Sequence, residues 1–360
     1  MEQPVDNGRP LDGVRVLELT HYVAGPYCGR LLADYGASVL KVERAGGDPA
    51  RGLPPAVRLD SGESESLLYL YLNHGKETLT LDLKTPEGHE RALELVREAD
   101  VVVENFRPGA LGRLGFAWED MQQANPGLVL TSISNFGQDG PYRDYRAWDI
   151  VADALGGLSY IFGYHDREPL THPNPQAQYR AGTCAAAATV AALLGQAITG
   201  VGEWVDVSIM ECVAAALRDT MPQYTFMGAV RRRGASRDGG FGSITACADG
   251  YVIPTAFGAA NWETLTRFLD APEMEDERFA TGDGRQLHAS DLTLLLRHRL
   301  EHCEKFGFFH GSQEWGIGAG IVLTPAELVE SEQLASRGFF QSIETADGRE
   351  IRAPRGPFEL

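Results

Sequence analysis

The stretch VRVLELTHYVAGPYCGRLLADYGASVLKVE, residues 14–43, decides the fold class of this chain. Two apolar runs, at 14–19 and 38–42, have the length and composition of buried strands. Between them, Pro26 suits the first position of a helix and Gly36 suits its end. The order strand, helix, strand predicts a β-α-β unit and a parallel sheet. Glu43 ends the second strand, where a dinucleotide fold places its acidic ribose ligand, but no G-x-G-x-x-G precedes it, so a nicotinamide site is not favoured.

More strands are expected in the first 210 residues. Apolar or alternating runs predict strands at 77–83, 100–104, 128–133 and 204–209. Thr85 and Pro86 suit a helix cap and a first helical position, so a helix is expected from there to about residue 98. A further helix is expected over 150–159. Residues 45–66 are rich in Gly, Pro and charge and are expected to form a surface loop.

The composition changes after about residue 225. A basic, glycine-rich stretch at 231–242 precedes a hairpin expected at 245–254, amphipathic helices over 262–316 and short terminal strands. A chain of 360 residues exceeds the size of one ordinary core, so two domains are expected.

Charge and cysteine usage limit the function classes. The net charge of -18 argues against a general nucleic-acid binder. The five cysteines are scattered without a C-x-x-C pair, which fits neither a disulfide framework nor a zinc site. A reduced, cytoplasmic compartment is the natural interpretation, and no metal is expected. The N-terminus lacks the apolar core of a signal peptide, and no segment approaches 18 uninterrupted apolar residues, so no membrane association is expected.

The stretch NPQAQYRAGTCAAAATVAALLG, residues 174–195, joins the polar trio Gln178-Tyr179-Arg180 to a run of small residues. A helix of small side chains lets a neighbouring backbone or a ligand approach closely. A trio directly before it would lie at its positively polarised N-terminal end. The residues alone leave two interpretations open: a site for chemistry, or a close-packed helix with an ordinary polar cap. Cys184 is expected to be a buried small side chain.

Four segments together resemble one protein family. They are residues 11–43, 81–116, 125–144 and 316–340. They occur in the order and spacing of the class III CoA-transferases, a superfamily that includes formyl-CoA and carnitine CoA-transferases and the α-methylacyl-CoA racemases. The resemblance extends over nearly the whole chain, from about residue 10 to residue 360.

The resemblance implies an α/β fold with a large doubly wound, Rossmann-like domain that binds CoA and a small α/β domain. Two chains would thread through one another as interlocked rings. The large domain would take residues 1–220 plus about 326–360, and the small domain about 228–325. The implied ligands are coenzyme A or an acyl-CoA as substrate and a carboxylic acid as acceptor.

The resemblance also carries CoA-binding positions over to this chain, residue by residue. Basic side chains among them would contact the phosphates, since Arg and Lys give strong charge-assisted hydrogen bonds to phosphate. Val23 would lie near the acyl group, and Gly239 and Gly240 match a glycine loop that folds over the reaction intermediate. The remaining positions are Arg44, Leu81, Lys84, Asn105, Phe106, Arg113, Leu114 and Arg146.

At the position of the family's nucleophile this chain has Gln178, four residues before Gly182. The transferases use an aspartate there, which attacks the thioester. A carboxamide is a very poor nucleophile, although it can donate a hydrogen bond to a thioester carbonyl or an oxyanion. The racemase branch moves a proton with His and Asp, and Trp148 and Gln178 occupy those positions. Asp149 is the nearest carboxylate that would serve as acid/base or acyl-enzyme surrogate; its alternative role is to cap the helix that follows.

Three interpretations of the function follow. The first is an enzyme that acts on an acyl-CoA with altered chemistry, by transfer through another group, isomerisation, hydrolysis or elimination. The second is a non-catalytic CoA-binding subunit, in a heterodimer with an aspartate-bearing paralogue rather than a homodimer. The third is a CoA-dependent sensor, or a protein that uses the fold for another thioester carrier.

Overall fold

The computed structural model describes residues 8–217, 219–233, 244–255 and 259–359. Contacts divide the chain into two compact units. The first contains the described residues up to Tyr160, residues 170–231 and residues from Ser336 onward. The second contains Ile161–Pro169 and the described residues from Arg232 to Ala335.

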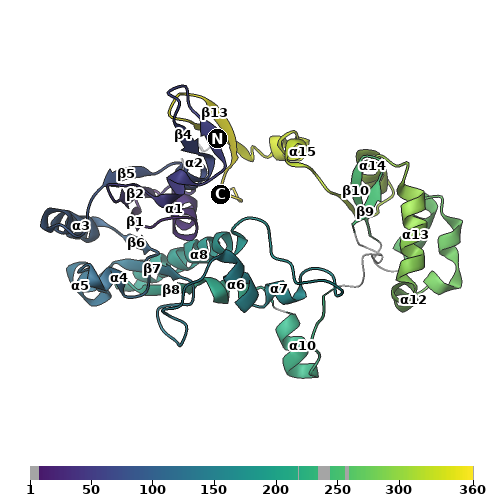
Figure 1. Cartoon of the computed structure of the whole chain (residues 1–360), viewed down its shortest axis with the longest axis horizontal. Coiled ribbons are helices and arrows are strands. Elements are labelled where there is room, and N and C mark those ends of the chain that lie inside the picture. The colour runs from purple at the N-terminus through teal and green to yellow at the C-terminus, as the bar shows by residue number, and fades with distance from the viewer. Residues whose placement is uncertain (1–7, 218, 234–243, 256–258, 360) are drawn as a thin grey trace, which may run out of the picture. The chain divides into compact units, whose positions relative to one another are not determined.

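The first unit is built on a six-stranded parallel sheet in the order β5-β2-β1-β6-β7-β8 (Figure 1). The chain runs outward from β1 on one side and from β6 on the other, so the strand order reverses between β1 and β6. This doubly wound order is that of Rossmann-like folds and confirms the predicted α/β class. The strands are β1 (Arg15–Leu19), β2 (Ser38–Glu43), β5 (Glu77–Thr80), β6 (Val101–Glu104), β7 (Val129–Ser134) and β8 (Trp204–Ser208).

Helices cover both faces of this sheet, because alternate strand residues point to opposite sides. On one face, Val16 and Val101 belong to a core shared with α1 (Ala24–Asp34), α8 (Gln176–Thr199) and α9 (Ile209–Ala214). On the other face, Leu17 and Val102 belong to a core shared with α3 (Pro86–Glu98), α4 (Ala110–Arg113) and α5 (Trp118–Ala124). The start of α3 is confirmed, since the Thr85 hydroxyl accepts a hydrogen bond from Gly88 N.

Two predictions within the first unit are wrong in detail. Residues 45–66 are not a plain surface loop. They contain a 3-10 helix (Pro49–Gly52) and an antiparallel pair, β3 (Ala56–Arg58) and β4 (Ser64–Ser66), before α2 (Leu67–Asn73). The helix expected over 150–159 is divided into α6 (Asp149–Leu155) and α7 (Leu158–Ile161), because Gly157 adopts a left-handed φ of 84° between them.

Helix α8 contains the polar trio, which lies inside its first turns rather than before it. Small residues such as Ala181 and Ala185 face the core, whereas Val190, Leu194 and Ile198 are exposed. In the part of the chain that the structure describes, α8 is the one helix long and apolar enough to span a membrane by length and composition, and a third of the window that passes this test is buried. Because it packs against α1 and β7, we treat α8 as a core helix with one uncovered apolar face.

The second unit has a three-stranded antiparallel sheet in the order β11-β10-β9. The expected hairpin at 245–254 is confirmed as β9 (Thr245–Cys247) and β10 (Gly250–Pro254), and β11 is Ala319–Ile321. Its helices include α11 (Ala259–Phe268), α12 (Gly282–Leu287), α13 (Ala289–Leu300), α14 (Lys305–Glu314) and α15 (Pro325–Val329). The first unit also contains α10 (Thr220–Met227) and a terminal antiparallel pair, β12 (Phe340–Glu344) and β13 (Glu350–Pro354).

Candidate functional site

Most positions expected to bind CoA follow the carboxyl ends of β1, β2, β5 and β6, which are neighbours in the sheet. In parallel sheets these ends share one edge, and ligands bind there at the point where the strand order reverses. We call this the carboxyl edge. In chain order the positions are Val23, Arg44, Leu81, Lys84, Asn105 and Phe106.

Asn105 joins the two turns that flank the reversal point. Its Oδ1 accepts a hydrogen bond from His21 N at 2.9 Å, and its Nδ2 donates to His21 O at 2.7 Å. The His21 ring lies 5.9 Å from the Phe106 ring in a stacked arrangement. The turn after β1 and the turn after β6 are therefore held in register, with Phe106 beside them.

Two arginines converge on the turn that follows β6. A Cβ added to Gly109 would lie 3.2 Å from Arg113 Nη1 and 2.9 Å from Arg143 Nη2. The Arg143 Nε atom is buried and has no hydrogen-bond partner, and neither arginine forms an ion pair within the described ranges. Gly109 has a φ of 73°, which glycine adopts without strain. The absence of a side chain also leaves room for the two arginines. The sequence reasoning named Arg113 and Arg146 but missed Arg143, three residues before Arg146 in the same loop.

The other expected contacts lie along this edge with fewer constraints. Arg44 and Lys84 are exposed, and Leu81 N donates to Glu43 O at 2.8 Å. Leu114 directly follows α4, and Arg146 is exposed in the loop after β7. The Glu43 carboxylate accepts hydrogen bonds from Asp48 N, Arg51 Nε and the Tyr69 hydroxyl, so the chain itself occupies this acidic group.

Beneath the carboxyl edge lies a buried network of four charges, Glu18, Lys41, Asp48 and Lys76, whose side chains are fully buried. Lys41 Nζ lies 3.0 Å from both Glu18 Oε1 and Asp48 Oδ2. Lys76 Nζ lies 2.7 Å from Glu18 Oε2. A side chain at Gly29 would collide with the Glu18 carboxylate, so a glycine in α1 makes room for the network. The two cations and two anions balance, as buried charges require.

The network fixes the backbone of the turn between β1 and α1. Lys41 Nζ donates to Thr20 O at 3.0 Å, and Lys76 Nζ donates to Pro26 O at 2.7 Å. Asp48 Oδ1 accepts from Tyr22 N at 3.1 Å, and Tyr22 has a left-handed φ of 65°. The turn that carries Val23 is therefore held from below at three points. Asp48 was missed because it lies in the stretch expected to be a surface loop.

Burial and pairing set the protonation of this network. Burial disfavours the charged form of Glu18, but Lys41 and Lys76 outweigh it and lower the pKa of this carboxyl. For Lys41, two carboxylate neighbours outweigh burial and raise the pKa. For Lys76, burial is the largest influence and lowers the pKa to about 8. Lys76 has one carboxylate partner where Lys41 has two, which accounts for the difference.

Gln178 lies on the face of α8 that approaches this turn. A Cβ on Gly182 would lie 2.6 Å from Ala24 O, so α8 contacts the first residue of α1 at that position. Gln178 is one helical turn earlier on the same face. Val23, which is buried, precedes Ala24 directly. The structure thus brings residue 178 toward the β1–α1 turn.

Asp149 lies beside Gln178. Its Oδ1 accepts a hydrogen bond from Gln178 N at 3.0 Å. The alternative role as a cap of its own helix is wrong, because Trp148 precedes α6, with no side-chain cap, and Asp149 binds the start of α8 instead. Burial raises the pKa of Asp149, although the N–H groups of Gln178 and Ala177 oppose the shift. Trp148 is largely exposed.

Glu104, the last residue of β6, is a site residue that the sequence reasoning missed. It is 3% exposed, and its Oε2 accepts a hydrogen bond from Phe106 N at 2.8 Å. Burial raises the pKa of this carboxyl to about 7. Its position at the end of a buried Val-Val-Val run was the available signal. Gly239 and Gly240 lie outside the described residues.

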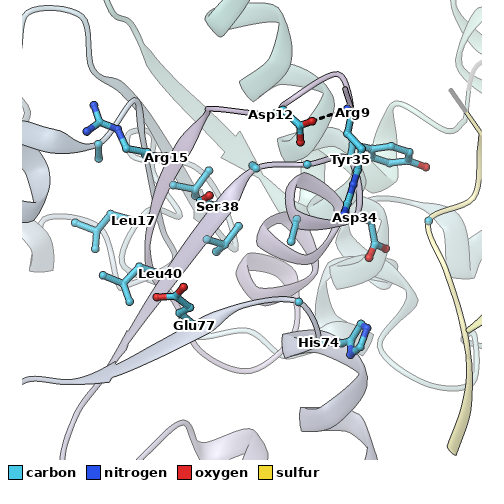
Figure 2. Close-up of a pocket in the computed structure, with 18 of the residues that line it drawn as sticks. Arg9, Asp12, Arg15, Leu17, Asp34, Tyr35, Ser38, Leu40, His74 and Glu77 are labelled. Carbon is cyan, nitrogen blue, oxygen red and sulfur yellow. Dashed lines mark hydrogen bonds between the residues drawn. The ribbon is translucent and has the colours of Figure 1, made fainter. Parts of the chain in front are cut away.

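A cavity of the first unit lies at the opposite edge of the sheet (Figure 2). This cavity of about 730 Å³ is lined by Arg15, Ser38 and Glu77, the first residues of β1, β2 and β5. We call this the amino edge. It is remote from the strand ends that bind ligands in such sheets. Among the described residues, no group of three or more His, Cys, Asp or Glu side chains could hold a metal ion.

Comparisons with known proteins find relatives along almost the whole chain. The succinyl-CoA–D-citramalate CoA-transferase of Chloroflexus aurantiacus is 36% identical over 355 residues, covering 96% of this chain and 86% of the relative. A succinyl-CoA:(R)-benzylsuccinate CoA-transferase subunit, BbsE, of Thauera aromatica is 31% identical, covering 98% of this chain and 88% of the relative. The crystal structure of a CAIB/BAIF family protein from Brucella suis superposes with a TM-score of 0.86 at 31% identity, covering 98% of this chain and 96% of that one.

The characteristic pattern of one family matches residues 11–360, almost the whole chain. The order of the sheet, the position of the reversal point and the relatives agree with that match. The chain therefore belongs to CoA-transferase family III.

Proposed function

We propose that this chain binds a CoA thioester along the carboxyl edge, with the phosphates of CoA against Arg113 and Arg143. The observation that carries the proposal is the convergence of these two side chains at Gly109, with no carboxylate paired to either in the described part of the chain. Like charges repel, so such a pair is stabilised by an anion between them. On a protein with a net charge of -18, this local excess of positive charge supports an anion site at this edge.

Calorimetric titration of CoA into the purified protein tests the proposal. Arg113→Gln and Arg143→Gln are each expected to weaken binding about tenfold or more, since a hydrogen bond to a charged group contributes about 1.5–3 kcal/mol. Arg15→Gln, at the amino edge, is the matched control and should bind CoA as the wild type does. Absence of CoA binding by the wild type, or an equal loss in the control, would contradict the assignment.

The proposed reaction uses Gln178, in the first turn of α8, and Asp149, the first residue of α6. In the proposed mechanism the Gln178 carboxamide donates a hydrogen bond to the thioester carbonyl and stabilises charge on its oxygen. It does not attack, because a neutral amide is a poor nucleophile. Asp149 is the nearest carboxylate and serves as the acid/base or acyl-accepting group. Its hydrogen bond to Gln178 N supports this role by holding it next to residue 178.

A panel of acyl-CoA substrates with carboxylic acid acceptors separates these roles. Gln178→Asp restores a carboxylate and is expected to gain CoA transfer through an intermediate that hydroxylamine traps at residue 178. The wild type should show no covalent change on the peptide that contains Gln178. A mass shift there after incubation with acyl-CoA would contradict the altered mechanism. Asp149→Asn is expected to lower any wild-type turnover at least tenfold, and full activity in this variant would exclude Asp149.

A second candidate is a non-catalytic CoA-binding subunit. The uncovered apolar face of α8, with Val190, Leu194 and Ile198, supports assembly with another chain. A relative whose name makes it a subunit supports a heteromer. We propose an interlocked dimer in either case. Co-expression with an aspartate-bearing relative tests it: activity confined to the mixed dimer favours the subunit, whereas turnover by this chain alone favours the enzyme.

A further inference from the structure

A second cavity of the first unit, about 660 Å³ in volume, lies on a different face of α8 from Gln178. Arg180 and Cys184 of α8 line one side, and Tyr27 of α1 and Tyr71 of α2 line another. Residues two apart on a helix point to nearly opposite sides, so Arg180 projects away from the side that carries Gln178. The cavity is therefore separate from the proposed acyl position.

Arg180 brings an uncompensated charge to this cavity. Its Nη1 atom is buried and has no hydrogen-bond partner within the described part of the chain. The described residues that line the cavity include neither Asp nor Glu. A buried cationic donor without a partner is costly, and native structures satisfy nearly all such groups. The partner that Arg180 lacks is an anion.

The walls around Arg180 are aromatic. The Tyr27 ring packs edge-to-face with the Tyr179 ring at 4.8 Å and lies 6.4 Å from the Tyr71 ring. Tyr71 and Thr183 line the same cavity. These side chains offer apolar area together with hydroxyl groups, which suits a ligand with an apolar body and one polar end.

Arg30 holds these walls in place. It is 1% exposed and pairs with Asp34 at 2.7 Å. It also donates to Tyr71 O and, at 3.3 Å, to Pro354 O, so one guanidinium joins α1 to α2 and β13. Tyr71 and Pro354 both line the cavity. The donors of Arg30 are thus committed to the protein, whereas Arg180 has a nitrogen to spare.

We propose that this cavity binds a small molecule that carries a carboxylate and an aromatic or aliphatic body, with the carboxylate on Arg180. The planar guanidinium matches a carboxylate in two parallel hydrogen bonds. The tyrosine walls accept the rest of the molecule. The ligand is a free acid rather than an acidic side chain of a second copy, and the site does not depend on the proposed CoA site.

Alkylation of Cys184 in the full-length protein tests this proposal, because this exposed thiol is part of the cavity wall. Iodoacetamide labelling is followed by peptide mass spectrometry with benzoate as probe, and Cys247 of the second unit serves as the internal reference. Benzoate is expected to slow labelling of Cys184 several-fold and to leave Cys247 unchanged. Benzamide, the neutral analogue of the same shape, should need at least a tenfold higher concentration to give the same protection of Cys184.

Variants connect the protection to Arg180. Arg180→Gln should abolish protection by benzoate, and Arg180→Lys, which keeps the charge but loses the planar fork, should retain part of it. Arg113→Gln is the matched control and should keep full protection even where CoA binding is lost, which separates this site from the proposed function. A thermal melt confirms that each variant is folded. If Arg180→Gln does not fold, the partial loss of protection in Arg180→Lys tests the role of Arg180 instead.

Three results would overturn the proposal. One is equal protection by benzamide and benzoate, and another is protection that persists in Arg180→Gln. The third is a wild-type Cys184 that resists alkylation without ligand but reacts once Arg180→Gln has lowered the oligomeric state in size-exclusion chromatography. That outcome would mean that a carboxylate of a second copy fills the cavity.

Discussion

The two edges of the six-stranded sheet differ in how their charges are compensated. At the amino edge the larger cavity is lined by both signs, and Arg15 pairs with Asp100 at 3.6 Å where water reaches both side chains. At the carboxyl edge the paired charges are buried, and Arg113 and Arg143 converge without a carboxylate. The uncompensated cations, rather than the volume of a cavity, distinguish the edge that we propose binds CoA.

The same contrast predicts how each edge contributes to stability. Removing one partner of a buried ion pair lowers the free energy of unfolding strongly, because the remaining charge has neither water nor a counter-ion. An exposed pair contributes little, since water and salt screen it. The three predictions below test this contrast, and a similar response at the two edges would break it.

The largest effect is expected from Lys41→Met. It leaves Glu18 and Asp48 buried without their shared cation, so the free energy of unfolding should fall by about 3–5 kcal/mol. Arg15→Met at the amino edge should change it by less than about 1 kcal/mol. Urea denaturation measures both. Equal losses in the two variants would show that the edges do not differ in this respect.

The next effect depends on pH and concerns Glu104. Burial raises the pKa of this carboxyl from 4.5 to about 7, so the folded state holds a proton that the unfolded state releases between these values. Stability present in acid is therefore lost as the pH rises through 7. Relative to Glu104→Gln, the wild type should lose about 2–3 kcal/mol between pH 5 and pH 8. Urea denaturation at both pH values measures the difference.

Glu98→Gln is the control for this experiment. Glu98 is an exposed carboxylate that lines the amino-edge cavity. Its replacement should change the free energy of unfolding by less than about 0.5 kcal/mol at either pH. A difference between wild type and Glu104→Gln that does not vary with pH would contradict the role of burial at Glu104.

The smallest effect concerns the space between the arginines. Gly109→Ala places a methyl group 2.9 Å from Arg143 Nη2, so the arginines must move apart and CoA affinity should fall about tenfold. Gly13→Ala at the amino edge has the same backbone demand, with a φ of 87°, but open space around it. Both should cost about 1–2 kcal/mol in stability. Only Gly109→Ala should weaken CoA in a calorimetric titration, and equal affinities would remove the role assigned to this turn.

The sequence predicted those strands and helices that are marked by residues close together in the chain. The buried run Val101–Glu104 and the Thr85-Pro86 pair are short-range patterns, and both elements formed where expected. The β3–β4 pair was missed because Gly, Pro and charge dominate its surroundings. Cys184 was expected to be buried and is exposed, since a helix made of small residues gives little indication of which face is covered.

The candidate site was predicted in part for a related reason. Positions carried over from the family require only alignment, and those from Val23 to Phe106 fall along one edge. Asp48, Lys76 and Arg143 are placed by contacts with residues distant in the sequence, which are Tyr22, Glu18 and Gly109 respectively. A single charged residue in a polar stretch has the same local appearance whether it is solvated or buried. Tertiary structure alone separates these cases.

The contact between Arg30 and Pro354 O has a consequence for synthesis of the chain. The two residues are 324 positions apart, so Arg30 leaves the ribosome long before Pro354, whose carbonyl accepts its last hydrogen bond, is synthesised. Until β13 emerges, Arg30 can reach Asp34 and Tyr71 O, but the acceptor of its Nη2 atom does not yet exist. The first unit therefore closes at the end of translation rather than during it, and the long interval exposes it to chaperones and proteases.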